Sequence, residues 1–351
     1  DYDDVLDVWM IQEPYLPDEY KQELQGMADG TGLSYEEVAV YNTWVGVFNT
    51  LHSCWGASLY GTATADGELI HMRSTDGVNT IDDPVTGTRI IENQVLIIRN
   101  PESAYASLSP IFAGDITSIG GFNEQAVAVS ELTIVGSDTT YEGINAGYRM
   151  RMVLDRADDL YEAERIMNTN RTCCWNFIIS DGKIPKGLAI EQTASIATAN
   201  TWDDPVESTE PFWAIKDVVR RGNCFINPTL AVYQRNHYDP RGIPGFLRMM
   251  FGIDGSFAAW TQYNAISNEI ENQYGSLDAE TALILLQDVY LGKTNMAFRM
   301  LLAENTQTGR QWTASPKTGD IYIRFSDHGE DAYLNPMHNF NLYDLLARDP
   351  P

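Results

Sequence analysis

Cys54, Arg73 and Asp76 are the residues whose types and spacing could do chemistry. Cys54 opens a stretch of small and β-prone residues, and an Asp66-Gly67 turn reverses the chain before a second apolar run ends at Arg73 and Asp76. This pattern predicts a β-hairpin that returns an arginine and a carboxylate to the cysteine at which the first strand began. A thiol needs a nearby positive charge to become a thiolate, and a third group to orient its base. The hairpin therefore predicts a cysteine nucleophile, and the alternative is a buried structural cysteine beside an ordinary turn.

The order of these residues resembles the acyl-coenzyme A:6-aminopenicillanate acyltransferase-like family of self-processing cysteine N-terminal-nucleophile (Ntn) hydrolases. Choloylglycine (bile-salt) hydrolases, penicillin V acylase and acid ceramidase are more distant relatives. In this superfamily the nucleophilic cysteine becomes the N-terminus of the mature chain, and an Arg-Asn-x-Asp segment ends the second strand. Here that segment is Arg73-Ser74-Thr75-Asp76, so Ser74 stands in place of the asparagine.

Two asparagines match further segments of the resemblance. Asn123 lies in the segment 120–126, which resembles the relatives' Gly-x-Asn-Glu-x-Gly-Leu, and this implies that Asn123 helps to form the oxyanion hole. A side-chain amide can donate a neutral hydrogen bond to the tetrahedral oxyanion. Asn227 lies in the segment 225–229, which resembles the relatives' Thr-Asn-x-Pro and makes it a second active-site amide. The alternatives are an asparagine at a turn and an asparagine that ends a strand.

Relatives also carry a late arginine near a helix start, where it helps to hold the substrate or to tune the thiol. Gln262 stands at this position. Either Arg248 replaces that arginine in space, or the site lacks the charge.

The resemblance implies a domain organisation and a function. Residues 1–53 would be a helical N-terminal pro-segment, removed by cleavage between Ser53 and Cys54, and residues 54–351 a single catalytic domain. The implied fold is α+β, a four-layer αββα sandwich of two stacked, mainly antiparallel sheets between helices. The implied function is a self-processing amidohydrolase that cleaves a linear amide through an acyl-thioester on Cys54. An acyltransferase that uses an amine acceptor and an unprocessed, non-catalytic member remain alternatives.

The pattern of apolar residues supports the same layering, because strands and helices follow one another without βαβ alternation. Periodicity predicts two helices within 16–50, the second starting at Ser34, and further helices over 144–168, 261–272 and 278–290. Strands are predicted over 54–58, 95–98, 126–130, 175–182, 187–192, 224–227, 311–313 and 321–324.

Composition limits the partners. The formal net charge is −26 and is dispersed along the chain, so nucleic-acid binding is not expected. The chain lacks a run of eighteen apolar residues, so a membrane span is not expected either. The expected partners are a small-molecule amide or N-acyl substrate and the chain's own pro-segment, with a homo-oligomer left open. No cofactor or metal is expected, because the His and Cys spacing has no zinc signature.

The cysteines bear on the cellular compartment. Cys173 or Cys174 could pair with Cys224 in an oxidising compartment, which would leave Cys54 free, and three reduced core thiols are the alternative. The chain begins at Asp1, which fits a removed leader or a boundary of the sequence. An extracytoplasmic or secreted location is expected, and a cytoplasmic one is left open.

The substrate cannot be read from the sequence. Trp55, Trp175 and Trp260 would suit an apolar acyl group, or they are core residues. The loops 77–94 and 231–259 are expected to set specificity. Hydrolysis is favoured over transfer, because water reaches any exposed thioester whereas transfer needs an acceptor pocket.

Overall fold

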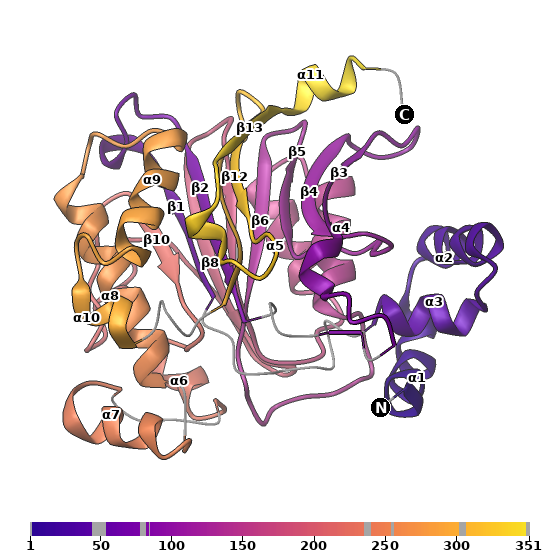
Figure 1. Ribbon diagram of the computed structural model, residues 1–351, viewed down its shortest axis with the longest axis horizontal. Helices are drawn as coiled ribbons and strands as arrows, with labels where there is room; N and C mark the ends of the chain where they lie inside the picture. The colour runs from indigo at the N-terminus through magenta and orange to yellow at the C-terminus, as the bar shows by residue number, and fades with distance from the viewer. Residues whose placement is uncertain are drawn as a thin grey trace.

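Two antiparallel sheets lie face to face with helices on their outer faces (Figure 1). The computed structural model describes residues 2–43, 54–77, 82–83, 85–234, 240–253, 256–301 and 307–348. The architecture is α+β with the layers helix, sheet, sheet and helix, as the sequence predicts.

The six-stranded sheet carries the predicted cysteine hairpin at its centre. Its strands, in spatial order, are β10 (Val218–Arg221), β1 (Trp55–Leu59), β2 (Ile70–Asp76), β11 (Thr308–Ser315), β12 (Asp320–Phe325) and β13 (His338–Asn341). In the hairpin, Trp55 is opposite Ser74 and Gly56 is opposite Arg73. Cys54 directly precedes β1, so the register places it beside Thr75.

The seven-stranded sheet follows chain order. Its strands are β3 (Gln94–Arg99), β4 (Ser107–Phe112), β5 (Gly120–Asn123), β6 (Val127–Thr133), β7 (Trp175–Asp181), β8 (Lys186–Gln192) and β9 (Ala197–Asn200). The predicted strands at 95–98, 126–130, 175–182 and 187–192 all fall in this sheet.

The two sheets approach closely between β1 and β8. A Cβ atom on Gly187 would lie 2.5 Å from the Cβ of Ser58, so only glycine allows the contact. Beside it, His71 of β2 lies fully buried between the hydroxyls of Ser130 and Ser180, at 2.9 and 2.7 Å. Burial lowers the pKa of His71 to about 3, so this imidazole is neutral and structural.

Helices cover both outer faces. On the six-stranded sheet, α8 (Ser256–Asn272) and α9 (Ala279–Tyr290) form one hydrophobic core with β1 and β2. On the seven-stranded sheet, α4 (Ala146–Arg156) and α5 (Leu160–Met167) form another. The predicted single helix over 144–168 is two helices, because Asp159 caps a new one with its side chain on the Glu162 amide.

The three N-terminal helices are joined to the sandwich by the second of them, whose Tyr20 and Glu23 contact Asp155 and Arg151 of α4. They are α1 (Tyr2–Gln12), α2 (Asp18–Thr31) and α3 (Tyr35–Tyr41), and Figure 1 shows them together at one side of the molecule. Ser34 and Glu37 form the capping box that starts α3, as the sequence predicts. The first helix was not expected from the sequence, and the part of the predicted second helix beyond residue 43 lies outside the described residues.

One predicted strand is wrong. Residues 224–227 form an irregular segment that leads into α6 (Pro228–Ala231), and the strand of this region is β10, which lies earlier in the chain. The correct pairing aligns Gly56 with Arg221. The remaining helices are α7 (Gly242–Met250), α10 (Met296–Leu301) and α11 (Leu342–Leu346).

Candidate active site

Cys54 directly precedes β1, inside the six-stranded sheet, and faces the other sheet. Its side chain is 3% exposed and packs in a small apolar cluster with Leu132, Ile178 and Val219. Burial raises the pKa of the Cys54 thiol to about 11, although Arg73 works to lower it. In the continuous chain, Cys54 therefore carries a neutral thiol. Ser53, the other residue of the predicted cleavage site, lies outside the described residues.

Arg73 lies beside Cys54 on the same face of the sheet. Its guanidinium interacts with the Cys54 thiol, and its Nη2 donates to Glu131 Oε1 at 2.7 Å across the gap between the sheets. Its Nη1 donates to the Ser74 carbonyl at 2.8 Å. The structure thus places Arg73 beside Cys54, and the Arg73 guanidinium interacts both with the thiol and with the Glu131 carboxylate of β6.

Asp76 reaches Cys54 through its backbone, while its side chain points to the helix layer. The Asp76 backbone amide interacts with the thiol. The carboxylate accepts hydrogen bonds from Gln262 Nε2 and the Tyr290 hydroxyl, both at 2.8 Å, and from the Ser74 hydroxyl at 3.0 Å. Burial raises the pKa of Asp76 to about 6, and these hydrogen bonds oppose the rise. A carboxylate with this pKa changes charge close to neutral pH.

In this chain, Gln262 of α8 occupies the position of the relatives' late arginine. Gln262 is fully buried on α8 and donates to Asp76, so a neutral amide stands next to the carboxylate. Arg248 lies exposed on α7 and does not take that place. The second cation of the site is instead Arg310 of β11, a residue that the sequence analysis missed. It is fully buried, and the charges of Arg73 and Cys54 both act on it.

Asn123 is not brought to Cys54. Its Nδ2 donates to the carbonyls of Leu154 and Ala157 at 3.1 and 2.8 Å, and its Oδ1 accepts from the Val127 amide at 3.0 Å. The side chain thus closes the β5–β6 turn and ties it to the end of α4. Asn123 is bonded to Val127 at the start of β6. Glu131, which pairs with Arg73, is four positions after Val127 in this strand, about 13 Å from it at the usual rise of a strand. This placement argues against the expected oxyanion role and favours the alternative, an asparagine at a turn.

The described contacts do not bring Asn227 to Cys54 either. Its Oδ1 caps α6 by accepting from the Thr229 amide at 2.9 Å, and its backbone amide donates to Glu191 Oε2 at 3.0 Å. A third asparagine, Asn223, lies two residues after the end of β10, the strand that pairs with β1. Continued by two pairs beyond Gly56–Arg221, the β1–β10 register would place Asn223 opposite Cys54, and the Asn223 Nδ2 donates to the Thr133 carbonyl at 2.8 Å.

Sequence reasoning missed Asn223 because the strand was placed at 224–227 instead of β10. The run Val218-Val219-Arg220-Arg221 hides a strand, because two arginines in sequence are an unusual pattern for a buried β-strand. Arg221 is tolerated there because it forms ion pairs with Glu191 and Glu207, and all three side chains are fully buried. Had β10 been recognised, its pairing with β1 would have indicated Asn223.

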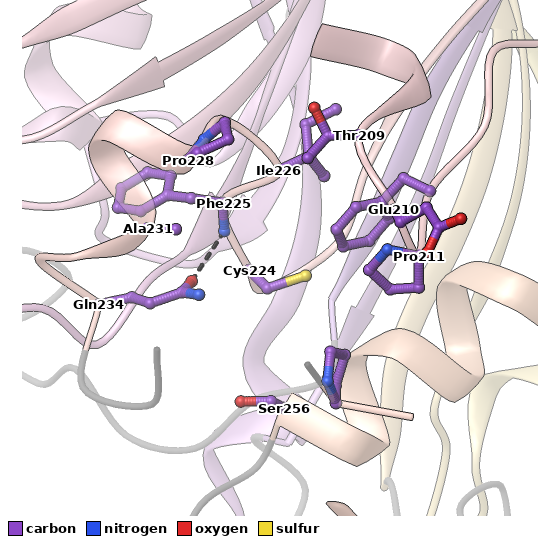
Figure 2. A pocket seen from close by; sticks show the side chains of 12 residues that line it. Thr209, Glu210, Pro211, Cys224, Phe225, Ile226, Pro228, Ala231, Gln234 and Ser256 are labelled. Atoms are coloured by element: carbon purple, nitrogen blue, oxygen red, sulfur yellow. Dashed lines mark hydrogen bonds between the residues drawn. The ribbon is translucent and has the colours of Figure 1, made fainter. Parts of the chain in front are cut away.

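A pocket of about 290 Å³ opens next to this strand end. Figure 2 shows Cys224, Phe225 and Ile226 on one side of it and the segment 209–212 on another. Its lining is largely apolar, and the Phe225 amide donates to Gln234 Oε1 at 2.9 Å. Cys54 does not line this pocket, but Gly222, two residues before the lining residue Cys224, lies near Cys54: a Cβ atom on Gly222 would be 3.9 Å from the Cys54 carbonyl oxygen.

The cysteines are free thiols, and the tryptophans of the sequence analysis are core residues. Cys54, Cys173, Cys174 and Cys224 are all free and buried. Trp55 and Trp175 are core residues, on opposite outer faces of the sandwich, and Trp260 packs partly buried against the first of these cores.

The described part of the chain offers no group of three or more His, Cys, Asp or Glu side chains that could hold a metal. Within the same ranges, no helix combines the length and apolar character needed to cross a bilayer.

Comparisons with known proteins give a distant set of relatives. No protein-family model matches the chain. Protein dcd1A of Dictyostelium discoideum is 28% identical over 176 residues, covering 46% of this chain and 37% of that protein. Protein dcd1B of the same organism is 22% identical over 345 residues, covering 97% of this chain and 61% of that protein. An uncharacterized protein of Archaeoglobus fulgidus is 21% identical and is covered to 49% of its length. The chain thus spans between about a third and two thirds of these curated relatives.

Three solved structures have a similar arrangement. Two variants of conjugated bile acid hydrolase from Clostridium perfringens each have a TM-score of 0.49 and 16% identity, over 83% of this chain and 93% of theirs. An N-acylethanolamine-hydrolyzing acid amidase ortholog of Caenorhabditis elegans has a TM-score of 0.45 and 12% identity, over 82% of this chain and 99% of its own.

Proposed function

We propose that this protein is a self-processing cysteine amidohydrolase that uses Cys54 as its nucleophile and hydrolyses a linear carbon–nitrogen amide bond. The observation that carries the proposal is the convergence of Cys54, Arg73 and the Asp76 backbone amide at one end of the β1–β2 hairpin, where Cys54 and Arg73 face the gap between the two sheets. A buried thiol with a guanidinium and a backbone amide directed at it is a place where a thiolate can be stabilised.

Processing would start from the neutral thiol. The Cys54 sulfur attacks the carbonyl carbon of Ser53, the peptide nitrogen leaves as the α-amine of Cys54, and a thioester joins the two residues. Water then hydrolyses the thioester, which returns the thiol and releases a carboxyl-terminal Ser53. The products are residues 1–53 and residues 54–351.

Turnover would use the new α-amine as the base. Such an amine has a pKa of about 7.7–8.0, so it can take the proton of its own thiol near neutral pH. The thiolate attacks the substrate amide, Arg73 stabilises the thiolate, and Asp76 orients the α-ammonium group. Asn223 is proposed to donate to the oxyanion, in the role first expected for Asn123 and Asn227. The protonated α-amine gives its proton to the leaving amine, and water resolves the acyl-thioester with the α-amine again as base.

The apolar pocket beside Cys224 is proposed to hold the acyl group. Its lining residue Cys224 is two positions from Gly222, which lies near the Cys54 carbonyl oxygen, and its volume of about 290 Å³ is enough for a short acyl chain or one aromatic ring. Most of its lining residues, including Phe212, Ile226 and Ala231, offer no hydrogen-bonding side chain.

A specific observation favours a second candidate, an unprocessed and non-catalytic member. Glu131 takes one arm of Arg73, and the pKa of the buried Cys54 thiol is raised to about 11. Both features hold the thiol neutral in the intact chain.

Mass spectrometry of the full chain separates the two candidates. Under denaturing and reducing conditions, after long incubation at neutral pH, the wild type should appear as residues 1–53 and 54–351, and Cys54→Ala should stay intact. A wild-type chain that stays intact would exclude self-processing and support the unprocessed, non-catalytic candidate. Screening the processed protein against N-acyl amino acids, simple amides and penicillin V, with and without an acceptor amine, tests hydrolysis against acyl transfer.

A further inference from the structure

Arg310 is a fully buried guanidinium without a hydrogen-bond partner. Its Nε, Nη1 and Nη2 are all shielded from solvent, and no acceptor within the described ranges reaches any of them. The Phe112 ring lies against its face, 4.7 Å from the guanidinium carbon, which leaves the N–H groups in the plane of the guanidinium unused. Buried charges are as a rule paired, so an unpaired arginine beside a nucleophile needs an explanation.

The sheet register places Arg310 in the same row of residues as Cys54. Arg310 is opposite Thr75 on β2, and Thr75 in turn lies beside Cys54, so the three residues form one row across the sheet. Their side chains therefore point to the same side, toward the gap between the sheets. Two strand spacings put the Cα atoms of Cys54 and Arg310 about 10 Å apart, within reach of an arginine side chain and a small ligand.

A β-bulge in β11 determines which face of the sheet Arg310 occupies. The register shifts between Thr308 and Arg310, so that Thr308 is opposite Asp76 and Arg310 is opposite Thr75. Thr308 then hydrogen-bonds the Asp76 carboxyl on the helix side, while Arg310 faces the opposite side. Bulges of this kind re-aim side chains and are frequent beside active sites.

The neighbouring charges do not satisfy Arg310. Glu131 is engaged by Arg73, and Asp115 Oδ1 accepts from the amide and hydroxyl of Thr117 at 2.8 and 2.7 Å. Both carboxylates act on Arg310 through space, as Arg73 and Cys54 also do, but neither carboxylate has a hydrogen bond to it. The second oxygen of each carboxylate also lacks a partner in the described part of the chain.

From this geometry we propose that Arg310 is the specificity-determining residue of the site, and that it binds a carboxylate carried by the substrate close to the scissile amide. A planar guanidinium with all its donors unused matches a carboxylate in a paired hydrogen-bond geometry. The inference rests on the proposed nucleophile Cys54 and names the substrate class that it acts on, an amide with a carboxylate on either its amine or its acyl side.

Alkylation of Cys54 tests the subsite without any amidase turnover. Iodoacetate and iodoacetamide differ only in a carboxylate, and each forms a C–S bond as iodide leaves. We expect the iodoacetate-to-iodoacetamide rate ratio at Cys54, divided by the ratio for N-acetylcysteine, to exceed about 10 in the processed wild type. The Cys54 peptide is identified by mass. A normalised ratio of 1 or less, or a Cys54 that reacts with neither reagent, would overturn the proposal.

Variants separate a binding role from a structural one. Arg310→Met should return the normalised ratio to about 1, and Arg310→Lys should restore part of it. Arg99→Met is the matched control, because Arg99 is a buried arginine whose Nη2 donates to the Ile116 and Thr117 carbonyls, and it should leave the ratio unchanged. A ratio that survives in Arg310→Met refutes the role of Arg310. Should Arg310→Met fail to fold, the wild-type ratio alone decides.

Two substrate pairs then locate the carboxylate. N-phenylacetylglycine against its glycinamide places the charge on the amine side, and N-benzylsuccinamic acid against its neutral amide places it on the acyl side. We expect the acid of one pair to have at least a tenfold higher kcat/KM, and Arg310→Met to remove that preference. Neutral analogues preferred in both pairs would contradict the inference while leaving the amidase activity itself established, whereas the absence of any turnover contradicts the proposed function and leaves the alkylation result to decide the subsite.

Discussion

At the scale of single residues, the site consists of a neutral thiol held beside two guanidinium groups. Cys54 is buried, which raises the pKa of its thiol to about 11, while Arg73 opposes that rise. Burial and the like charge of Arg73 lower the pKa of Arg310 to about 9, which leaves it protonated at neutral pH. The thiolate that the proposed chemistry needs must therefore be produced by a change at Cys54 itself, and release of its α-amine would be such a change.

Arg73 is predicted to set the reactivity of the processed thiol. Replacing Arg73 with Met should raise the thiol pKa, slow alkylation by iodoacetamide at pH 7 at least tenfold and lower kcat/KM by about a hundredfold, because an adjacent cation stabilises the thiolate. The measurement is the rate of alkylation of the Cys54 peptide from pH 5 to 10. Identical profiles in wild type and Arg73→Met would show that Arg73 does not act on the thiol.

The ionised carboxylate of Asp76 is predicted to destabilise the folded state while supporting activity. Its pKa is raised from 3.8 to about 6, so the folded state binds this proton more tightly than the unfolded chain does. The ionised carboxyl therefore lowers the free energy of unfolding by about 3 kcal/mol above pH 7, and this cost disappears as the pH falls through 6 toward 4. Asp76→Asn should remove the cost at pH 8 while reducing activity strongly.

The check for Asp76 is chemical denaturation of wild type and Asp76→Asn at pH 8 and pH 5. The variant's relative stability should be higher at pH 8 than at pH 5 by about 1.4 kcal/mol, because roughly half of the cost of ionising Asp76 is still present at pH 5. Ser315→Ala is the control, since it lies at the far end of β11 from the site. A pH-independent difference between Asp76→Asn and wild type would contradict the raised pKa.

At the scale of elements, the placement of strand β10 decides which asparagine can act. A strand over 224–227 would favour Asn227, whereas the observed pairing of β10 with β1, extended beyond Arg221, favours Asn223 as the asparagine closer to Cys54. Asn123 and Asn227 serve as a turn clamp and a helix cap.

Three alanine variants should separate these roles. Asn223→Ala is expected to lower kcat by about 10²–10³ with little change in stability, as loss of one oxyanion donor does. Asn227→Ala should mainly cost about 1 kcal/mol of stability through loss of a cap. Asn123→Ala should destabilise the fold by at least about 2 kcal/mol, because it leaves several buried backbone groups unpaired. Steady-state kinetics and denaturation of each variant provide the measurements, and a normal kcat in Asn223→Ala would exclude its proposed role.

The pocket beside α6 is predicted to select the acyl group. Ala231 lines it and is 7% exposed, so Ala231→Trp should fill it and raise KM for phenylacetyl amides at least tenfold. Acetyl amides, which do not need the pocket, are the internal comparison. An equal effect on both substrates would indicate a general distortion of the site instead.

At the scale of the whole molecule, the N-terminal helices are bound to the sandwich by polar contacts as well as apolar ones. The Tyr20 hydroxyl donates to Asp155 Oδ2 at 2.9 Å, and Arg151 of α4 pairs with both Asp155 and Glu23. Trp9, Leu16 and Leu24 belong to the same hydrophobic core as α4.

We therefore expect residues 1–53 to stay bound after cleavage. Size-exclusion chromatography of the processed protein in native buffer should give one peak that contains both fragments, while denaturant should separate them. Leu24→Ala, which removes a fully buried side chain, should weaken the association, and the exposed Gln25→Ala should not. Two separate peaks in native buffer would show that these contacts do not hold the segment in place.

The sequence by itself determined most of the strands and the hairpin that carries Cys54, whereas α1 and β10 were missed. The Asp66-Gly67 turn and the apolar runs on either side fix the pairing of β1 with β2, since a hairpin is closed by residues near one another in the chain. For the same reason, Arg73 and Asp76 could be placed at Cys54. The capping box at Ser34 and the hairpin formed by β7 and β8 are equally local.

Only the tertiary structure decided which distant residues complete the site. Glu131 of β6 pairs with Arg73 from the opposite sheet, Arg310 lies opposite Thr75 next to a bulge in β11, and Asn223 follows the end of β10. No local pattern marks them, because strand order and the packing of two sheets depend on contacts between residues far apart in the chain. A bulge that moves a side chain to the other face depends on a single inserted residue, and the period of a strand does not reveal it.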